Sequence, residues 1–389
     1  MDFELWYLIL VPLLFAAGWF ARSFDIKEKQ TIANEKDTLY KGVDLLLSNK
    51  QDLAIDAFIN LVKLDPDTVE MHFSLAGLFR RRGEFDRAIK IHNVLVNRED
   101  LPKKIRSRAL YELGEDYLKA GLWDRAEECF LKLSDTSESY KTIARKELLH
   151  IYETEKEWQK AIDEANIIQR QSGEDQSTRI AQLYCELTQQ NLYFKNFKGA
   201  AEALEKALKV DPNNKRALII KGKMLKAKGD IDGALATWKQ VGQISPVYGT
   251  LVVEQIASLL LEAGRKEEAV KYLEDLFKDG STTDEVDTAG ILLGKAGNSK
   301  EAITLIQEHL KTQPTLVAFY RLIDLRLANE PENESLKQLH GLLKNMLSKA
   351  VRYKCTKCGF ATRKFLWRCP GCHQWETFPP VRQENLSGK

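Results

Sequence analysis

Apolar residues recur along most of the chain with the spacing of amphipathic helices, and these helices follow one another in pairs. From residue 35 to residue 315 the pairs repeat with a period of about 34 residues. Each pair has an alanine early in its second helix: Ala54, Ala88, Ala126, Ala161, Ala200, Ala234, Ala269 and Ala302. Successive alanines are 33 to 39 residues apart. The pattern therefore predicts eight helix-turn-helix units with small differences in loop length.

Two other positions of the unit hold small residues. The turn between the helices carries Gly83, Gly121, Gly229, Gly264 and Gly297, and the first helix carries Gly42, Ala76, Gly114, Gly222, Ala257 and Gly290. Antiparallel helices joined by a short turn approach closely only where a glycine or an alanine meets the neighbouring helix. Lys156 and Lys195 depart from the pattern, because they occupy the turn position of their units. Bulky residues one turn after the alanines, such as Phe130 and Trp238, are expected to fill the space between successive pairs.

This period and this order of small and large residues resemble the tetratricopeptide family. The resemblance covers residues 35–315 and implies an α-solenoid whose concave surface holds partner proteins. Charged first-helix residues are candidates for that contact, although a solvated helix face is the favoured interpretation of any one of them. The candidates are Arg80, Arg81, Arg216, Lys223 and Lys226. Residues 316–350 are expected to form an irregular helical cap.

The first 21 residues follow a different pattern. Leu5 to Ala21 holds no charged residue, and a helix of that length spans roughly 26 Å, close to the apolar thickness of a bilayer. A cleaved signal peptide begins with basic residues, whereas this segment begins with Asp2 and Glu4. The sequence therefore predicts a transmembrane anchor at residues 1–21 and a juxtamembrane linker at residues 22–34.

Basic residues follow the apolar segment directly, at Arg22, Lys27 and Lys29. Positive charges are retained on the cytoplasmic side of a membrane. We therefore expect a single-pass protein whose N-terminus lies outside the cytoplasm and whose body faces it.

Four of the six cysteines form a pattern of two CxxC pairs separated by ten residues: Cys355, Cys358, Cys369 and Cys372. Two residues between thiolates allow one tight turn to direct both sulfurs at a common ion, and two such turns complete a tetrahedral set. The pattern predicts one structural metal ion, with Zn²⁺ favoured and Fe possible. His373 is interpreted as an exposed loop residue because four thiolates already complete the set.

The metal-binding module is assigned to residues 351–380, with a tail at residues 381–389. A segment this short needs the metal to fold. Its aromatic residues are expected to form a small core around the metal: Phe360, Phe365, Trp367, Trp375 and Phe378. The module resembles the rubredoxin-like zinc ribbon, so the predicted fold class is all-α, with an N-terminal transmembrane helix, a tetratricopeptide solenoid and this ribbon.

Composition and charge narrow the function. The chain is 44% hydrophobic and 29% charged with a net charge of +2, as expected for a folded protein that faces water. Residues 351–389 hold eight Lys or Arg against two Asp or Glu, so a nucleic-acid-binding ribbon is one alternative. An electron carrier is another, because a single iron in four thiolates can change its redox state. The sequence has no GxxxxGK[ST], HExxH or GxSxG motif, and we expect a protein that is not an enzyme.

The whole arrangement resembles the lipopolysaccharide assembly protein B family of Gram-negative bacteria. The resemblance covers the initial MDFELWYLILVPLLFAAGWFAR, the repeats and the terminal CTKCG and RCPGCHQW. It implies an adaptor in the bacterial inner membrane, with its N-terminus in the periplasm, that promotes proteolysis of the lipid A deacetylase LpxC by the protease FtsH. Other membrane proteins of lipopolysaccharide assembly or its regulation are further implied partners.

Overall fold

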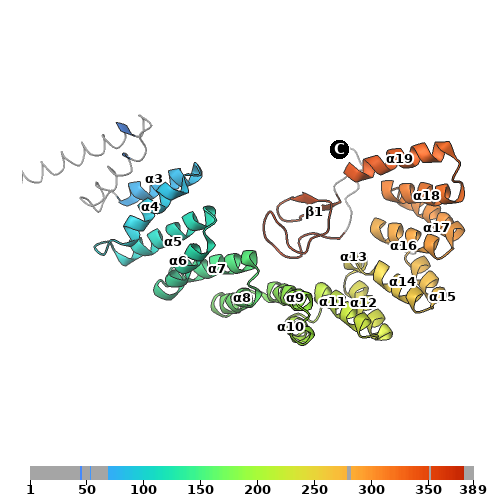
Figure 1. The fold of residues 1–389 in the computed structure, drawn as a ribbon, viewed down its shortest axis with the longest axis horizontal. Coiled ribbons are helices and arrows are strands. Elements are labelled where there is room, and N and C mark those ends of the chain that lie inside the picture. The colour runs from blue at the N-terminus through green and yellow to red at the C-terminus, as the bar shows by residue number, and fades with distance from the viewer. Residues whose placement is uncertain (1–43, 46–52, 54–68, 278–281, 350–351, 381–389) are drawn as a thin grey trace, which may run out of the picture. The chain divides into compact units, whose positions relative to one another are not determined.

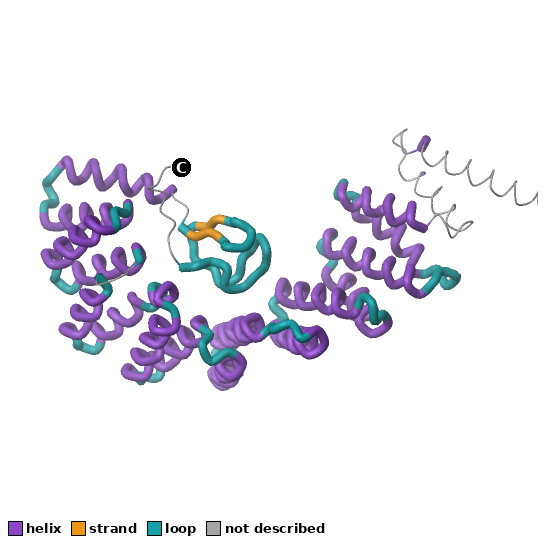
Figure 2. Tube along the Cα trace, turned by 180° about the vertical axis from the view of Figure 1, so that it is seen from behind, coloured by secondary structure: helices purple, strands orange, loops and turns teal. Residues whose placement is uncertain are grey.

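The computed structural model describes residues 44–45, 53, 69–277, 282–349 and 352–380 (Figure 1). The predicted anchor, the linker, the repeat position Ala54 and the tail lie outside these residues. Within the described ranges, no helix is long and apolar enough to cross a membrane. The described chain is a tetratricopeptide-type array of helices that ends in a small ribbon (Figure 2).

The helices divide at Gly173 into two compact units. Unit 1 contains α3 (Val69–Arg81), α4 (Phe85–Val96), α5 (Lys103–Lys119), α6 (Trp123–Thr136), α7 (Lys141–Glu155) and α8 (Trp158–Ser172). Unit 2 contains α9 (Ser177–Tyr193), α10 (Phe197–Val210), α11 (Lys215–Ala227), α12 (Ile231–Ile244), α13 (Pro246–Gly249), α14 (Val253–Glu262), α15 (Lys266–Asp275), α16 (Thr283–Lys295), α17 (Ser299–Thr312), α18 (Leu316–Asn329) and α19 (Glu334–Lys349). Unit 2 also contains the ribbon, in which β1 (Tyr353–Lys354) pairs antiparallel with β2 (Ala361–Thr362). The short helix α13 begins at Pro246, because proline is tolerated in the first turn of a helix.

The repeat positions inferred from the sequence have one geometry throughout. Each described alanine of the series is fully buried: Ala88, Ala126, Ala161, Ala200, Ala234, Ala269 and Ala302. The glycines of the turn position all have positive φ, from 73° at Gly264 to 88° at Gly297. Lys156 (φ 62°) and Lys195 (φ 58°) adopt the same left-handed conformation. Their units therefore keep the turn of the repeat without its glycine, at a strain of roughly 1 kcal/mol each.

In two units the glycine of the first helix packs against a large side chain of its own pair. A Cβ atom on Gly114 would lie 2.7 Å from the Phe130 ring. On Gly222 it would collide with the Trp238 indole, whose Nε1 donates a hydrogen bond of 3.1 Å to the Ile219 carbonyl. The contact within each of these pairs sets the spacing of its two helices. Trp238 also belongs to one core cluster with Val252, Ile256 and Leu260 of the next pair, so it fills the space between successive pairs as predicted.

Gly222→Ala should destabilise the protein by about 1–3 kcal/mol, because the added methyl group must displace a buried, hydrogen-bonded indole. Gly77→Ala is the matched control, since a Cβ atom there meets no heavy atom within 4 Å. In the interior of α3 this change should stabilise by up to about 1 kcal/mol. Urea unfolding of the two variants measures both effects. An unchanged midpoint for Gly222→Ala would contradict the packing described here.

Unit 1 brings two carboxylates together on neighbouring first helices, Glu115 on α5 and Glu147 on α7. Burial, and then the charge of Glu115, raise the pKa of Glu147 from its ordinary 4.5 to about 7. The folded state therefore holds this proton more tightly than the unfolded chain does. The contribution of Glu147 to stability falls as the pH rises from about 4.5 to about 7.

Glu147→Gln should consequently stabilise the protein at pH 8 by an amount on the order of 1 kcal/mol, given the partial solvation of the group. The gain should disappear below pH 4.5, where Glu147 is protonated in both states. Thermal unfolding across this pH range provides the measurement. Glu128→Gln on the exposed side of α6 serves as the control. A gain that is the same at pH 4 and pH 8 would refute the assignment.

Candidate metal centre

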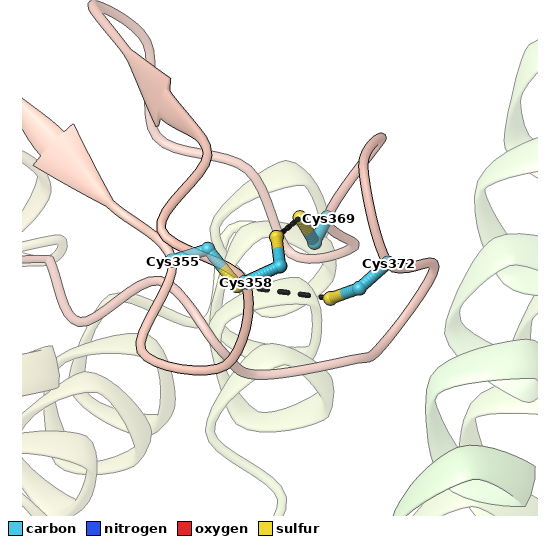
Figure 3. A group of neighbouring side chains, drawn as sticks. All are labelled: Cys355, Cys358, Cys369 and Cys372. Atoms are coloured by element: carbon cyan, nitrogen blue, oxygen red, sulfur yellow. Dashed lines mark hydrogen bonds between the residues drawn. The ribbon is translucent and has the colours of Figure 1, made fainter.

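The four cysteines of the two CxxC pairs lie together in the ribbon (Figure 3). Their sulfur atoms are all within 4.8 Å of one another. The Sγ atoms of Cys355 and Cys372 are 3.7 Å apart, and those of Cys358 and Cys369 are 3.6 Å apart. A tetrahedral ion with metal–sulfur bonds of about 2.3 Å places its ligands about 3.8 Å apart. The donor set therefore fits one four-coordinate ion, and Zn²⁺ and Fe satisfy it alike.

Both CxxC pairs are held by the same kind of tight turn. The Gly359 amide donates to the Cys355 carbonyl at 3.0 Å, and the His373 amide donates to the Cys369 carbonyl at 2.8 Å. Gly359 (φ 76°) and His373 (φ 57°) both have the left-handed backbone that closes such a turn. The side chain of His373 is exposed and does not belong to the sulfur cluster. Its place in the turn agrees with its interpretation as a loop residue.

Hydrogen bonds prepare Cys355 to bind a cation. Burial disfavours the thiolate, yet hydrogen bonds from Thr377 and from the amides of Cys358 and Lys357 outweigh it and lower the pKa of Cys355 to about 6. The Lys357 amide lies 3.4 Å from the sulfur. Because a metal binds the thiolate, these donors favour the ligating form.

The ribbon's core contains fewer aromatic residues than the sequence analysis predicted. Phe378 is fully buried and packs with Cys355 and Cys369, and Phe365 joins them in part. Phe360 is 42% exposed. The assignment of all five aromatic residues to a core around the metal was therefore wrong. Trp367 and Trp375 face the helices of unit 2 instead.

Aromatic contacts join the ribbon to the inner side of unit 2, beside α9, α11 and α13 (Figure 1). The Trp367 ring stacks on Tyr248 of α13, with centroids 5.6 Å apart and planes 16° apart. Phe365 packs edge-on against Trp367 at 4.9 Å. The Arg216 guanidinium of α11 lies 5.8 Å from the Trp367 ring and 5.9 Å from the Trp375 ring. One cation therefore contacts both tryptophans.

Polar contacts fix the ribbon in the same place. The Glu376 carboxylate accepts a hydrogen bond of 2.8 Å from Gln182 of α9 and pairs with Lys215 of α11 at 3.1 Å. The Thr250 hydroxyl donates to the Pro380 carbonyl at 3.3 Å. Burial and the nearby Glu376 carboxylate raise the pKa of Tyr248. These polar contacts are partly shielded from solvent. Together with the aromatic contacts they form the docking site of the ribbon.

The candidate partner-binding residues have different surroundings. Arg216 is 4% exposed beneath the ribbon and pairs with Glu186 at 2.9 Å. Arg80 of unit 1 is bound to Asp116 at 2.5 Å and to Glu112 at 2.6 Å. These two arginines therefore hold their own units together.

The other three candidates lie nearer to solvent. Arg81 of unit 1 and Lys223 of unit 2 are exposed, and Lys226 pairs with Glu262 at 2.7 Å. Sequence reasoning missed Gln182, Lys215, Tyr248 and Glu376, the residues that dock the ribbon. One feature of the sequence could have indicated a docking site: the ribbon has more aromatic residues than so small a core can bury.

Fold and site together define a tetratricopeptide-repeat protein with a C-terminal metal-binding module of the rubredoxin type. Residues 353–380 match the family of the rubredoxin metal binding domain, and residues 41–99 and 192–241 match the tetratricopeptide repeat. A solved tetratricopeptide repeat protein from Parabacteroides merdae is 16% identical and covers 72% of this chain and 100% of its own, with a TM-score of 0.32.

Two curated relatives match almost the whole chain, and both are lipopolysaccharide assembly protein B. The protein of Escherichia coli K12 is 36% identical over 96% of this chain and 97% of its own. The protein of Haemophilus influenzae Rd is 30% identical over 97% of this chain and 98% of its own. The chain belongs to the lipopolysaccharide assembly protein B family.

Removing the metal with a chelator should unfold the ribbon and release it from unit 2. Amide hydrogen exchange should then speed up in residues 352–380 and at the docking surface of α9, α11 and α13. The helices of unit 1 are the internal control and should keep their protection, and added Zn²⁺ should reverse the change. Unchanged exchange in the ribbon after verified metal loss would show that the metal does not hold its fold.

Proposed function

We propose that this protein is a non-catalytic, membrane-tethered adaptor of lipopolysaccharide assembly that promotes proteolysis of LpxC by FtsH. The observation that carries the proposal is membership of the lipopolysaccharide assembly protein B family over nearly the full length of the chain. The repeat architecture supports it, because stacked helical pairs offer extended surfaces for protein partners.

The proposed mechanism is an increase in effective concentration. A segment at residues 1–21 that anchors the chain in the inner membrane would keep its body beside a membrane protease. Capture of the second partner then becomes nearly intramolecular, which can strengthen the assembly by two or more orders of magnitude without any new contact. The adaptor breaks no bond itself, since the protease supplies the chemistry.

The docked ribbon gives this adaptor a surface that the repeats alone lack. It covers Arg216 and Tyr248, and it exposes basic residues of its own in their place. These residues are Arg352, Lys354, Lys357, Arg363 and Lys364. In the proposal the ribbon and the helices of unit 2 act as one composite surface, and the metal keeps that surface assembled.

The two alternatives from the sequence are weaker candidates. A nucleic-acid-binding ribbon would stack bases on exposed aromatic residues, whereas Trp367 and Trp375 are engaged with Tyr248 and Arg216. An electron carrier remains compatible with the four sulfurs, but relatives that match the whole chain are named for lipopolysaccharide assembly.

Breaking the docking site should raise the cellular level of LpxC several-fold. The double variant Trp367→Ala, Glu376→Ala removes the ring stack and the carboxylate anchor while it keeps all four cysteines. Deletion of residues 1–21 should raise LpxC similarly by removing the tether. Lys221→Ala, at an exposed position of α11, is the matched control. Immunoblotting of LpxC against a protease-deficient strain gives the measurement. Wild-type LpxC levels in the untethered form would refute tethering as the mechanism.

A further inference from the structure

The turn between α9 and α10 displays three aromatic side chains to solvent. Tyr193 is 82% exposed, Phe194 70% and Phe197 66%. These are the highest exposures of large hydrophobic side chains in the part of the chain that the structure describes. Tyr193 and Phe194 pack edge-on against each other, with centroids 5.3 Å apart. The six residues Tyr193 to Lys198, here called the aromatic turn, thus form a protruding apolar patch.

The other repeats show that this exposure is not a property of the position. Phe197 begins the second helix of its pair, and Phe85, Trp123, Trp158 and Ile231 begin theirs. Each of those four side chains is half-buried or buried. The positions equivalent to Tyr193 and Phe194 hold polar residues or alanine in the other described units. The repeat fold therefore does not itself require solvent-exposed aromatic rings at these positions.

The backbone holds the patch in place. Asn196 caps α10 by accepting a hydrogen bond of 3.0 Å from the Gly199 amide, and its side chain donates to Asn191 at 3.0 Å. Lys195 has the left-handed conformation that closes the turn. The three rings are consequently displayed by a fixed turn, so little ordering entropy opposes their insertion into a partner.

The charges of the turn favour an anionic partner. Lys195 and Lys198 are exposed between and beside the rings, and the six residues include no acidic side chain. Glu202, one helical turn further along α10, is the first acidic residue after them. Aromatic rings flanked by lysines suit the headgroup region of a bilayer, where rings insert at the interface and lysines meet anionic lipids.

We propose that the aromatic turn is a second membrane contact, which inserts Tyr193, Phe194 and Phe197 into the interface of an anionic lipid bilayer. The contact goes beyond the proposed adaptor function and requires neither LpxC nor FtsH. A protruding tip matches a flat, deformable surface, whereas a protein partner would need a pocket for three adjacent rings. The contact would hold unit 2 against the lipid surface.

The test uses the full-length chain in vesicles that contain phosphatidylglycerol and brominated lipids. An environment-sensitive fluorescent amino acid is introduced at position 195 and, as the matched control, at position 156. Lys156 occupies the same turn position with the same left-handed backbone, but its neighbour Trp158 is only 8% exposed. Quenching by the brominated lipids should be at least twofold greater at position 195 than at position 156. It should fall to the level of position 156 in purely zwitterionic vesicles.

The variant Tyr193→Ser, Phe194→Ser, Phe197→Ser should lose the extra quenching while circular dichroism shows unchanged helix content. Equal quenching at the two positions, or quenching that survives this triple substitution, would overturn the proposal. If position 195 stays unquenched while the triple variant loses control of LpxC in cells, the turn binds a protein and the membrane contact is wrong. Flotation of the intact chain with the vesicles reports separately on the anchor at residues 1–21.

Discussion

The docking of the ribbon in unit 2 depends on the burial of one cation, the Arg216 guanidinium, against the rings of Trp367 and Trp375. The guanidinium of Arg216 is almost fully buried and would be unstable there without partners. Glu186 supplies the opposite charge, and Trp367 and Trp375 close over the group from the ribbon. The rings reach it only when the ribbon is folded, and the ribbon folds around its four sulfurs. Metal binding, ribbon folding and docking on the repeats are therefore thermodynamically linked.

Much of the repeat architecture was predictable because close helix packing requires small residues at regular positions in the sequence. An alanine that must fit between helices recurs every 33 to 39 residues, and the full burial of Ala126 and Ala234 confirms their place in the packing. Gly114 and Gly222 are recognisable for the same reason, since any side chain there would strike Phe130 or Trp238. The cysteine spacing was equally informative, because only a narrow set of turns directs two sulfurs at one ion.

The docking site was not predictable, because its residues are common ones at positions without a strict steric rule. An arginine on a first helix has the same pattern whether water or another domain covers it, so Arg216 was grouped with the exposed Lys223. Glu376 and Gln182 are separated by 194 residues, and no periodicity connects them. The aromatic turn was missed for a related reason: Phe197 fits the repeat pattern, and only the structure shows that its side chain is uncovered.

We propose that this chain works by holding a substrate and a protease at one membrane. The most direct test reconstitutes it with FtsH in vesicles and follows the degradation of added LpxC. Degradation should accelerate when the chain and FtsH share a vesicle, and should return to the basal rate when they occupy separate vesicles. Equal rates in the two arrangements, or no acceleration in either, would contradict the account.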